Sequence, residues 1–270
     1  GDVVCGEAID GLHAGFHREI VKRLGPAPGR VRRAISVGCG AGGKELALLQ
    51  TGAVGEFDCY DVSAEAVEAG RRLAREHGVG DRMRFHRADA FDAALGSDHD
   101  LVYWNNALHH MFDTHRAVAW SRERLGPGGL FAMDDYVGAP RFQHADAIMD
   151  WAALLLALLP DRLLAHWDAA RATTIPRRPG RHDPQALATM DPSEAVDSQN
   201  ILPAIRSVFP GAEIIRTGGT VYFIALCEAF QNFDSAEDLR LLDALLAIDH
   251  AVAQREETQY AVAFARRDWT

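Results

Sequence analysis

Glycines and polar side chains that could do chemistry follow several short apolar runs. The run Ala34–Val37 ends in Gly38, Gly40 and Gly42, and a helix-forming segment begins at Gly43. Glycine allows a positive φ and lets a ligand approach the backbone without a Cβ in between. The N–H groups that open a helix face such a ligand. This stretch therefore predicts a cofactor-binding loop.

The loop alone leaves the identity of its cofactor open. Gly38, Gly40 and Gly43 fit the G-x-G-x-x-G pattern of dinucleotide-binding folds, while Gly38, Gly40 and Gly42 fit the G-x-G-x-G loop of S-adenosylmethionine (SAM) enzymes. Both kinds of site use an acidic residue at the end of the next strand to hold ribose hydroxyls. Asp61 supplies that residue, so downstream segments must decide between them.

A histidine pair, His109-His110, could supply a base. Histidine has an unperturbed pKa near 6.5 and can remove a proton from a reacting hydroxyl. Asp135 and Tyr136 end a later apolar run and could orient either the base or the acceptor. His109, His110, Asp134, Asp135 and His144 could be taken for metal ligands, but they lack the arrangement of a divalent-ion site, so we expect no metal.

The elements that must position these residues alternate along the first half of the chain. Such alternation of strands and helices predicts a parallel sheet with helices on both faces. Ser63 is expected to cap one helix, which ends at Gly78, and Asp113 or Thr114 to cap another. Leu125–Gly129 is expected to be a turn. The expected strands are Ala34–Val37, Glu56–Asp61, Met83–Arg87, Asp100–Trp104 and Leu130–Asp134, and the expected helices include Ala8–Leu24 and Gly43–Thr51.

After about Ala139 the alternation breaks. We expect one domain of residues 1–270, with an N-terminal helical cap at 1–30 and a helical insertion at 139–200 over the carboxyl edge of the sheet, where open α/β folds bind ligands. The apolar helix of the insertion could be core, or the face of a homodimer. The further expected elements are helices Ala145–Leu159, Asp161–Ala172, Val221–Gln231 and Ser235–Gln254, a helix to Phe209, a linker Ile175–Pro184, and strands Glu213–Arg216 and Tyr260–Ala265.

Composition limits the classes of partner. A formal charge of -10 argues against a nucleic-acid partner, because phosphate contacts need clustered Lys and Arg. The longest apolar run, Trp151–Leu159, stops at Pro160 and is too short for a transmembrane helix, which takes about 20 residues. Four scattered cysteines suggest a reducing compartment, so a cytoplasmic location is expected. The chain begins at Gly1, which is consistent with an excised part of a longer chain or with a tag remnant.

Three downstream features favour SAM over a dinucleotide. These are Asp89 after the third strand, where a carboxylate can accept the adenine amino group, the Asn- and His-rich segment from Asn105, and the turn Leu125–Phe131. With them, the order of VGCGAG, YDVS, ADAF, ALHHM and LGPGGLF resembles the class I SAM-dependent methyltransferases over residues 8–135. The resemblance implies a Rossmann-like, seven-stranded sheet whose last strand is antiparallel. It also implies SAM contacts from Gly38, Gly40, Gly42, Asp61, Val62, Asp89, Ala90 and Asn105.

The rest of the chain looks like a bacterial methyltransferase subgroup that is often associated with polysaccharide and glycoconjugate gene sets. The segments that carry this resemblance are Asp135–Gly138 with Arg141–Gln143, then Asp191–Val196, Gly218–Thr220 and Asn232–Phe233. It implies a small-molecule or glycan acceptor, for which Arg141, Gln143 and His144 are candidate contacts. The chain departs from the pattern at Ser36, where many relatives have an acidic residue, and at Asp197, where the subgroup has Arg.

The leading hypothesis is methyl transfer from SAM to an oxygen of a small-molecule or carbohydrate-like acceptor. Transfer to nitrogen or carbon is the alternative within the same class, and an amine acceptor would need little help from a base. A non-catalytic SAM-binding regulatory domain of a larger protein is the alternative from another class. An NAD-dependent oxidoreductase is weaker, since no downstream segment resembles a hydride-transfer site.

Overall fold

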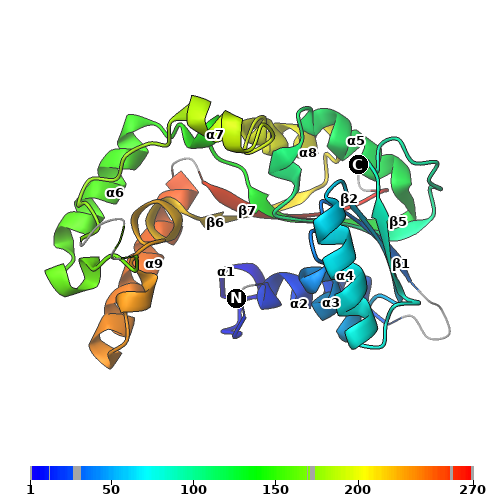
Figure 1. The fold of residues 1–270 in the computed structure, drawn as a ribbon, viewed down its shortest axis with the longest axis horizontal. Helices are drawn as coiled ribbons and strands as arrows, with labels where there is room; N and C mark the ends of the chain where they lie inside the picture. Colours follow the sequence, from blue (N-terminus) through cyan, green and yellow to red (C-terminus); the bar gives the residue numbers. More distant parts are fainter. Residues whose placement is uncertain are drawn as a thin grey trace. The chain divides into compact units, whose positions relative to one another are not determined.

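The computed structural model describes residues 2–11, 13–26, 32–168, 170, 174–255 and 258–268 (Figure 1). The chain divides into two compact units. Unit 1 consists of Gly1–Asp135, Asp197–Ile215 and Val262–Thr270, and unit 2 of Tyr136–Val196 and Arg216–Ala261. The expected single domain with an insertion at 139–200 stays a prediction, and unit 2 joins a later segment to the inserted one.

The described strands form one seven-stranded sheet in the order β3-β2-β1-β4-β5-β7-β6 (Figure 1). Strands β1 to β5 are parallel where they pair. The last strand is antiparallel to β5, because Arg267 N–H donates to the Gly129 carbonyl and Val137 N–H to the Gln259 carbonyl. The predicted fold class is therefore confirmed. The strands are β1 (Arg33–Val37), β2 (Glu56–Asp61), β3 (Met83–Arg87), β4 (His99–Asn105), β5 (Leu125–Tyr136), β6 (Glu213–Gly218) and β7 (Tyr260–Arg266).

The expected turn Leu125–Gly129 is part of β5. Leu125 pairs with His99, and the next pairing joins Leu130 to Leu101, so one strand advances five residues while the other advances two. The segment is a bulge at the start of the strand, with Gly128 at φ 68. The prediction of a separate turn was wrong because these residues belong to β5, whose first residue pairs with β4.

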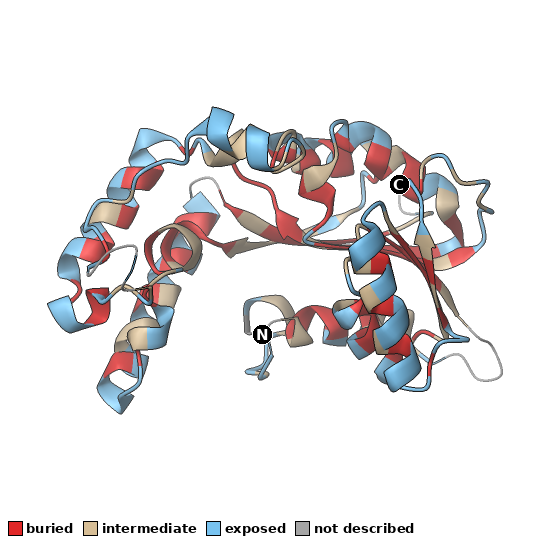
Figure 2. Cartoon of the chain, in the orientation of Figure 1, coloured by how far each residue is buried: buried red, intermediate tan, exposed pale blue. Residues whose placement is uncertain are grey.

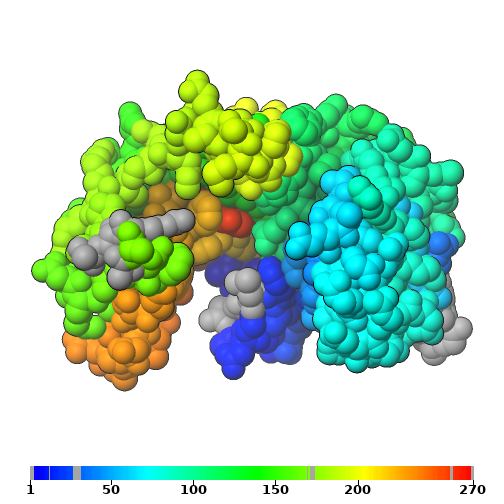
Figure 3. All heavy atoms as spheres, viewed as in Figure 1, coloured from blue at the N-terminus to red at the C-terminus, as the bar shows by residue number. Residues whose placement is uncertain are grey.

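Helices cover both faces of the sheet in unit 1. On one face, side chains of α2 (Ala14–Leu24), α3 (Gly43–Gln50) and α4 (Ala64–Glu76) pack with alternate residues of the strands in one apolar core. Figure 2 marks the buried residues of these helices in red. On the other face lie α5 (Thr114–Arg124) and α8 (Ile201–Val208), where Phe131 stacks on Phe209 at 5.1 Å between ring centroids. Figure 3 shows α4 at the surface of unit 1. The exposed residues of this helix include Glu65, Glu68 and Arg72, which are charged.

The expected helix Ala8–Leu24 is shorter in the structure. It begins at Ala14, after Gly11 at φ 116, and a separate helix α1 spans Asp2–Cys5. A positive φ cannot continue a right-handed helix, which explains the break. Leu12 of the expected helix, and Gly1 and residues 27–30 of the predicted cap, lie outside the described residues.

Side-chain caps begin the helices that flank the sheet. Ser63 accepts the Ala66 N–H, and Asp113 accepts the Arg116 N–H, as the sequence predicts. Asp197 accepts both the N–H of Thr114 at 3.0 Å and its hydroxyl at 2.8 Å. The residue that departs from the subgroup pattern thus stabilises the start of α5.

Unit 2 is helical around its own apolar core. The core is formed by α6 (Asp146–Leu158), a 3-10 helix (Asp161–Leu164), a π-helix (Thr220–Ala225) and α9 (Ala236–Arg255). A short helix α7 spans Pro184–Met190 and was not predicted. The outward side of α6 exposes Trp151, Leu154 and Leu158, so a dimer contact there stays a prediction.

Two expected helices of unit 2 are not continuous. Only the first four residues of Asp161–Ala172 are helical, because Ala165 then forms an antiparallel bridge with Thr174; residues 169 and 171–173 lie outside the described residues. Val221–Gln231 is replaced by the π-helix and a 3-10 helix, Phe230–Asn232. Within the described ranges, no helix combines the length and apolarity needed to span a bilayer.

Candidate functional site

The turn between β1 and α3 has the backbone form that its glycines predict. Gly38, Gly40 and Gly42 have φ of 66, 56 and 73. A Cβ at Gly42 would lie 2.5 Å from the ring of Phe85, whereas a Cβ at Gly40 would have no atom within 4 Å. Packing against Phe85 therefore explains why residue 42 is a glycine. Gly40, in contrast, borders open space that a ligand can enter.

Asp61 joins the end of β2 to this turn. Its Oδ2 accepts the Gly40 N–H at 2.8 Å, and its Oδ1 accepts the Ser63 N–H at 2.8 Å. A carboxylate oxygen has two lone pairs, so each can also accept a hydroxyl of a ligand. The next side chain, Val62, is 72% exposed and offers apolar surface beside the carboxylate.

Asp89 and Ala90 follow β3. The Asp89 carboxylate is exposed, and one of its oxygens accepts the Phe91 N–H at 2.9 Å. The described residues 88–98 contain no helix, so Asp89 is not a helix cap. Ala90 is buried, and its contact with SAM stays a prediction.

A buried polar network lies at the carboxyl end of β4. The amide of Asn105 donates to the Tyr103 hydroxyl at 2.8 Å, and that hydroxyl lies 2.8 Å from Nε2 of His17. Burial, with nearby positive charge, lowers the pKa of His17 to about 4, so its ring is neutral and can accept the tyrosine proton. Asn105 Oδ1 is buried and has no partner among the described residues.

A second buried acceptor lies in the first turn of α3. Glu45 Oε1 accepts the Ser36 hydroxyl at 2.7 Å, and Glu45 Oε2 is buried without a described partner. The neighbouring Lys44 ammonium donates to the Asn105 carbonyl. Sequence reasoning missed Glu45, Lys44, Tyr103 and His17, and the one available signal was the hydroxyl at Ser36 where an acid is usual.

The predicted base has a carboxylate partner. His109 Nδ1 lies 2.5 Å from Asp135 Oδ1, and both side chains are buried. Asp135 Oδ2 accepts the N–H groups of Ala107 and Leu108 at 2.9 and 2.7 Å. The carboxylate is thus held between β5 and the short helix after β4, where it orients the imidazole. With Nδ1–H donated to Asp135, Nε2 is the basic nitrogen of a neutral ring.

The sequence of this region has a family match. Residues 35–131 match a family model described as a methyltransferase domain. The fold is that of class I methyltransferases. The matched residues 35–131 contain the glycine turn, Asp61, Asp89, Asn105 and His109.

Part of the chain is similar to two curated methyltransferases. Ribosomal RNA large subunit methyltransferase G of Streptomyces coelicolor is 31% identical over 132 residues, which are 47% of this chain and 34% of that protein. The 27-O-demethylrifamycin SV methyltransferase of Amycolatopsis mediterranei is 30% identical over 118 residues, 43% of each chain. The chain thus spans less than half the length of these relatives.

The fold likeness extends over nearly the whole chain. A crystal structure of geranyl diphosphate C-methyltransferase from Streptomyces coelicolor A3(2), in complex with Mg2+, geranyl-S-thiolodiphosphate and S-adenosyl-L-homocysteine, matches 95% of this chain and 76% of that chain. The TM-score is 0.55 and the sequence identity is 14%. At this identity the comparison shows the fold.

The remaining predicted catalytic residues differ in their surroundings. The His110 ring lies beside that of His109 in unit 1, with centroids 4.2 Å apart. Tyr136 belongs to unit 2, where it is buried and its hydroxyl donates to the Ala139 carbonyl at 2.8 Å. Its catalytic role, and the absence of a metal, stay predictions.

The predicted acceptor contacts lie in unit 2. The Arg141 guanidinium donates to the carbonyls of Asp191, Pro192 and Glu194, so it holds a turn of the backbone. The Gln143 amide donates to the Arg141 carbonyl at 3.0 Å and to the His182 carbonyl at 2.8 Å. Both side chains thus form hydrogen bonds to backbone carbonyls, and their binding to an acceptor stays a prediction. His144 is buried beside a cavity of unit 2.

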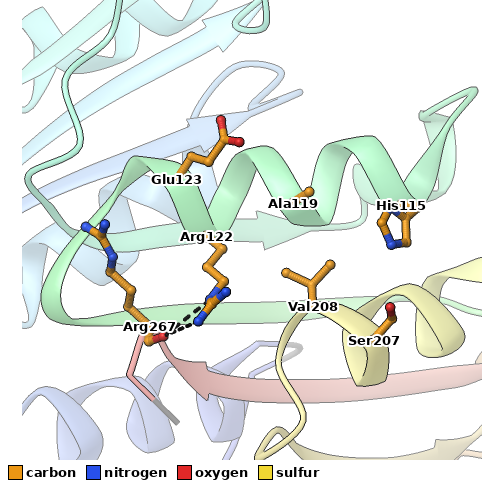
Figure 4. Close-up of a pocket in the computed structure, with 7 residues that line it drawn as sticks. All are labelled: His115, Ala119, Arg122, Glu123, Ser207, Val208 and Arg267. Carbon is orange, nitrogen blue, oxygen red and sulfur yellow. Dashed lines mark hydrogen bonds between the residues drawn. The ribbon is translucent and has the colours of Figure 1, made fainter. Parts of the chain in front are cut away.

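A cavity of about 480 Å³ lies elsewhere on unit 1, between α5 and α8 (Figure 4). The Arg122 guanidinium crosses it and donates to the Arg267 carbonyl at 3.4 Å. Its lining contains none of the predicted site residues. The residues that line it are His115, Ala119, Arg122, Glu123, Ser207, Val208 and Arg267.

Proposed function

We propose that this chain is a SAM-dependent methyltransferase that transfers a methyl group to an oxygen of a small-molecule or carbohydrate-like acceptor. The observation that carries the proposal is the buried His109–Asp135 pair. His109 follows β4, Asp135 lies at the end of β5, and the glycine turn follows β1, so all three lie at the carboxyl edge of the parallel strands, where open α/β sheets bind ligands.

The residues present fit SAM. Its methionine part carries an ammonium group, which donates hydrogen bonds, and Asn105 Oδ1 and Glu45 Oε2 are buried acceptors with no described partner. Buried acceptors are costly when unpaired, so a donor ligand would remove that cost. Asp61 would accept the ribose hydroxyls, Asp89 the adenine amino group, and Gly40 leaves room for the ligand. When bound, SAM supplies a methyl group on a sulfonium that leaves readily.

His109 and Asp135 would carry out the proton transfer. The acceptor oxygen attacks in line with the departing sulfur, and His109 Nε2 takes the hydroxyl proton as the oxygen–carbon bond forms. Asp135 keeps Nδ1 protonated and stabilises the imidazolium that results. The backbone N–H groups of Ala107 and Leu108 hold Asp135 in place for this role.

Transfer to carbon or nitrogen is the second candidate, since the structure compared above is that of a C-methyltransferase. The similar ribosomal RNA methyltransferase raises nucleic acid as an acceptor. We consider it disfavoured, because the formal charge of -10 offers no general attraction for phosphates. A non-catalytic domain that binds SAM would lack turnover with every acceptor.

The experiment is incubation of the chain with methyl-labelled SAM and a panel of hydroxyl, amine and activated-carbon acceptors. We expect label in hydroxyl compounds, and a loss of about 10²- to 10⁴-fold in kcat for His109→Ala. His115→Ala, an exposed histidine of α5, is the matched control and should retain full activity. Label in amines that survives His109→Ala would support the second candidate, and SAM binding without any label would support the non-catalytic one.

A further inference from the structure

Unit 2 contains a cavity of about 260 Å³ with an aromatic wall. Phe142 lies at the centre of this wall, with its ring 5.7 Å from Phe223, 5.5 Å from His182 and 6.3 Å from His144. Rings in such offset and tilted arrangements make favourable contacts with a further ring. The apolar side chains of Met149 and Ile224 also line the space, so its shape and chemistry suit a planar apolar group.

The backbone beside this wall is strained. Arg141 and Phe142 have φ of 53 and 55, in the left-handed region that non-glycine residues rarely adopt. The Arg141 N–H donates to the carbonyl of Ala195, which itself has φ 48. Such strain persists only where surrounding contacts hold it, and it is concentrated at ligand sites. Here it places the Phe142 ring in the cavity wall.

One nitrogen of the cavity lining makes no hydrogen bond of ordinary geometry among the described residues, although the Gln259 side chain interacts with the same ring. His144 is 6% exposed, and its Nδ1 is buried without a hydrogen-bond partner among the described residues. Burial lowers the pKa of His144 to about 4, so the ring is neutral at pH 7. A neutral imidazole has one acceptor nitrogen. A hydroxyl group of a ligand could therefore donate to it.

The charged groups around the cavity are already paired. Arg181 donates to the His144 carbonyl at 2.7 Å and to the Asp146 carboxylate at 2.5 Å. The Glu228 carboxylate lies 3.5 Å from the His166 ring. Burial raises the pKa of the Cys227 thiol and so keeps it neutral. An anionic ligand would find no unpaired cation among these groups.

We propose that this cavity of unit 2 binds a neutral small molecule that carries an aromatic ring and a hydroxyl group, with the ring against Phe142 and Phe223 and the hydroxyl donating to His144. The site goes beyond the proposed methyl transfer, because it predicts binding whether or not the ligand is a substrate.

The test measures binding of probe molecules to the whole chain by calorimetry. S-adenosylhomocysteine is present so that it occupies the proposed SAM site and the probes do not bind there. The probes are 1-naphthol, 1-methoxynaphthalene, which has no hydroxyl donor, and 1-naphthyl phosphate, which is anionic. We expect 1-naphthol to bind, the methyl ether to bind about fivefold to tenfold more weakly, and the phosphate not to bind. His144→Phe should make naphthol and its ether bind equally.

Two cavity-filling variants test the location. Ala225→Trp should abolish binding of 1-naphthol, and Ile224→Trp, at a half-buried lining position, serves if the first variant does not fold. Ala119→Trp fills the cavity of unit 1 instead and should leave binding unchanged. Equal affinity of the unmodified chain for naphthol and its ether, or binding that survives the filled cavity, would overturn the proposal. Neither outcome depends on methyl transfer.

Discussion

Ser36 donates a hydrogen bond to Glu45 across 2.7 Å in the buried base of the glycine turn. Both side chains are 1% exposed, and burial raises the pKa of the Glu45 carboxyl. The resemblance to class I methyltransferases implies an acid at position 36. In this chain the strand supplies the hydroxyl, and a carboxylate from the following helix is its partner.

Ser36→Ala should lower the free energy of unfolding by about 1–3 kcal/mol, because the Glu45 carboxyl loses its donor in a buried site. Glu45→Gln should cost less in stability, yet weaken SAM binding, since an uncharged amide attracts an ammonium group less. Urea denaturation of the two single variants and the double variant measures their coupling. Additive stability changes would show that the hydrogen bond contributes nothing.

Gly40→Ala should weaken SAM binding by more than tenfold while lowering stability by only about 1–2 kcal/mol. Its Cβ would meet no protein atom within 4 Å, so the variant carries the cost of a positive φ and places a methyl group in the ligand's space. Gly42→Ala is the comparison variant. Its Cβ would clash with Phe85, so this variant should be strongly destabilised. Calorimetric titration and thermal melting separate the two effects, and normal SAM affinity of Gly40→Ala would contradict the assignment.

Stability should fall as the pH falls from about 6.5 toward 4. Burial, His13 and Lys44 lower the pKa of folded His17 from 6.5 to about 4, so the unfolded state binds the proton first in this window. Above pH 6.5 the free energy of unfolding is at its full value, because His17 is neutral in both states. As the pH falls to about 4, protonation of His17 in the unfolded state lowers it by a total of about 3 kcal/mol. Urea titrations of wild type and His17→Gln should diverge by about 2 kcal/mol between pH 7 and pH 5. His77→Gln, at an exposed position, should follow the wild type; parallel curves for all three proteins would refute the effect.

Asp135→Asn should reduce kcat by about 10²- to 10³-fold and change the SAM dissociation constant by less than about threefold. The asparagine oxygen can still accept a backbone N–H, but a neutral amide no longer stabilises the imidazolium of His109. Initial rates with an acceptor that the wild type methylates, together with calorimetry, make the comparison. A fall in SAM affinity without a fall in kcat would place Asp135 in binding rather than in proton transfer.

Local signals in the sequence were enough to predict several strands and the glycine turn after β1. Glu56–Asp61 and Met83–Arg87 have the expected bounds, because apolar residues that alternate with polar ones between turn residues favour strands. Ser63 and Asp113 were identified as caps because their partners lie within three residues. Leu125–Gly129 was misassigned because the pairing that captures it involves His99, which is distant in the sequence.

The amino-acid sequence by itself determined the order of the sheet elements, the glycine turn and the residues that end the strands, since these depend on backbone preferences within a few neighbouring positions. Tertiary structure decided that Asp135 holds His109, that Glu45 partners Ser36, and that Phe142, His144 and Phe223 line one cavity. Such contacts join residues far apart in the chain. Their hydrogen bonds, burial and pKa shifts arise from the packing that brings them together.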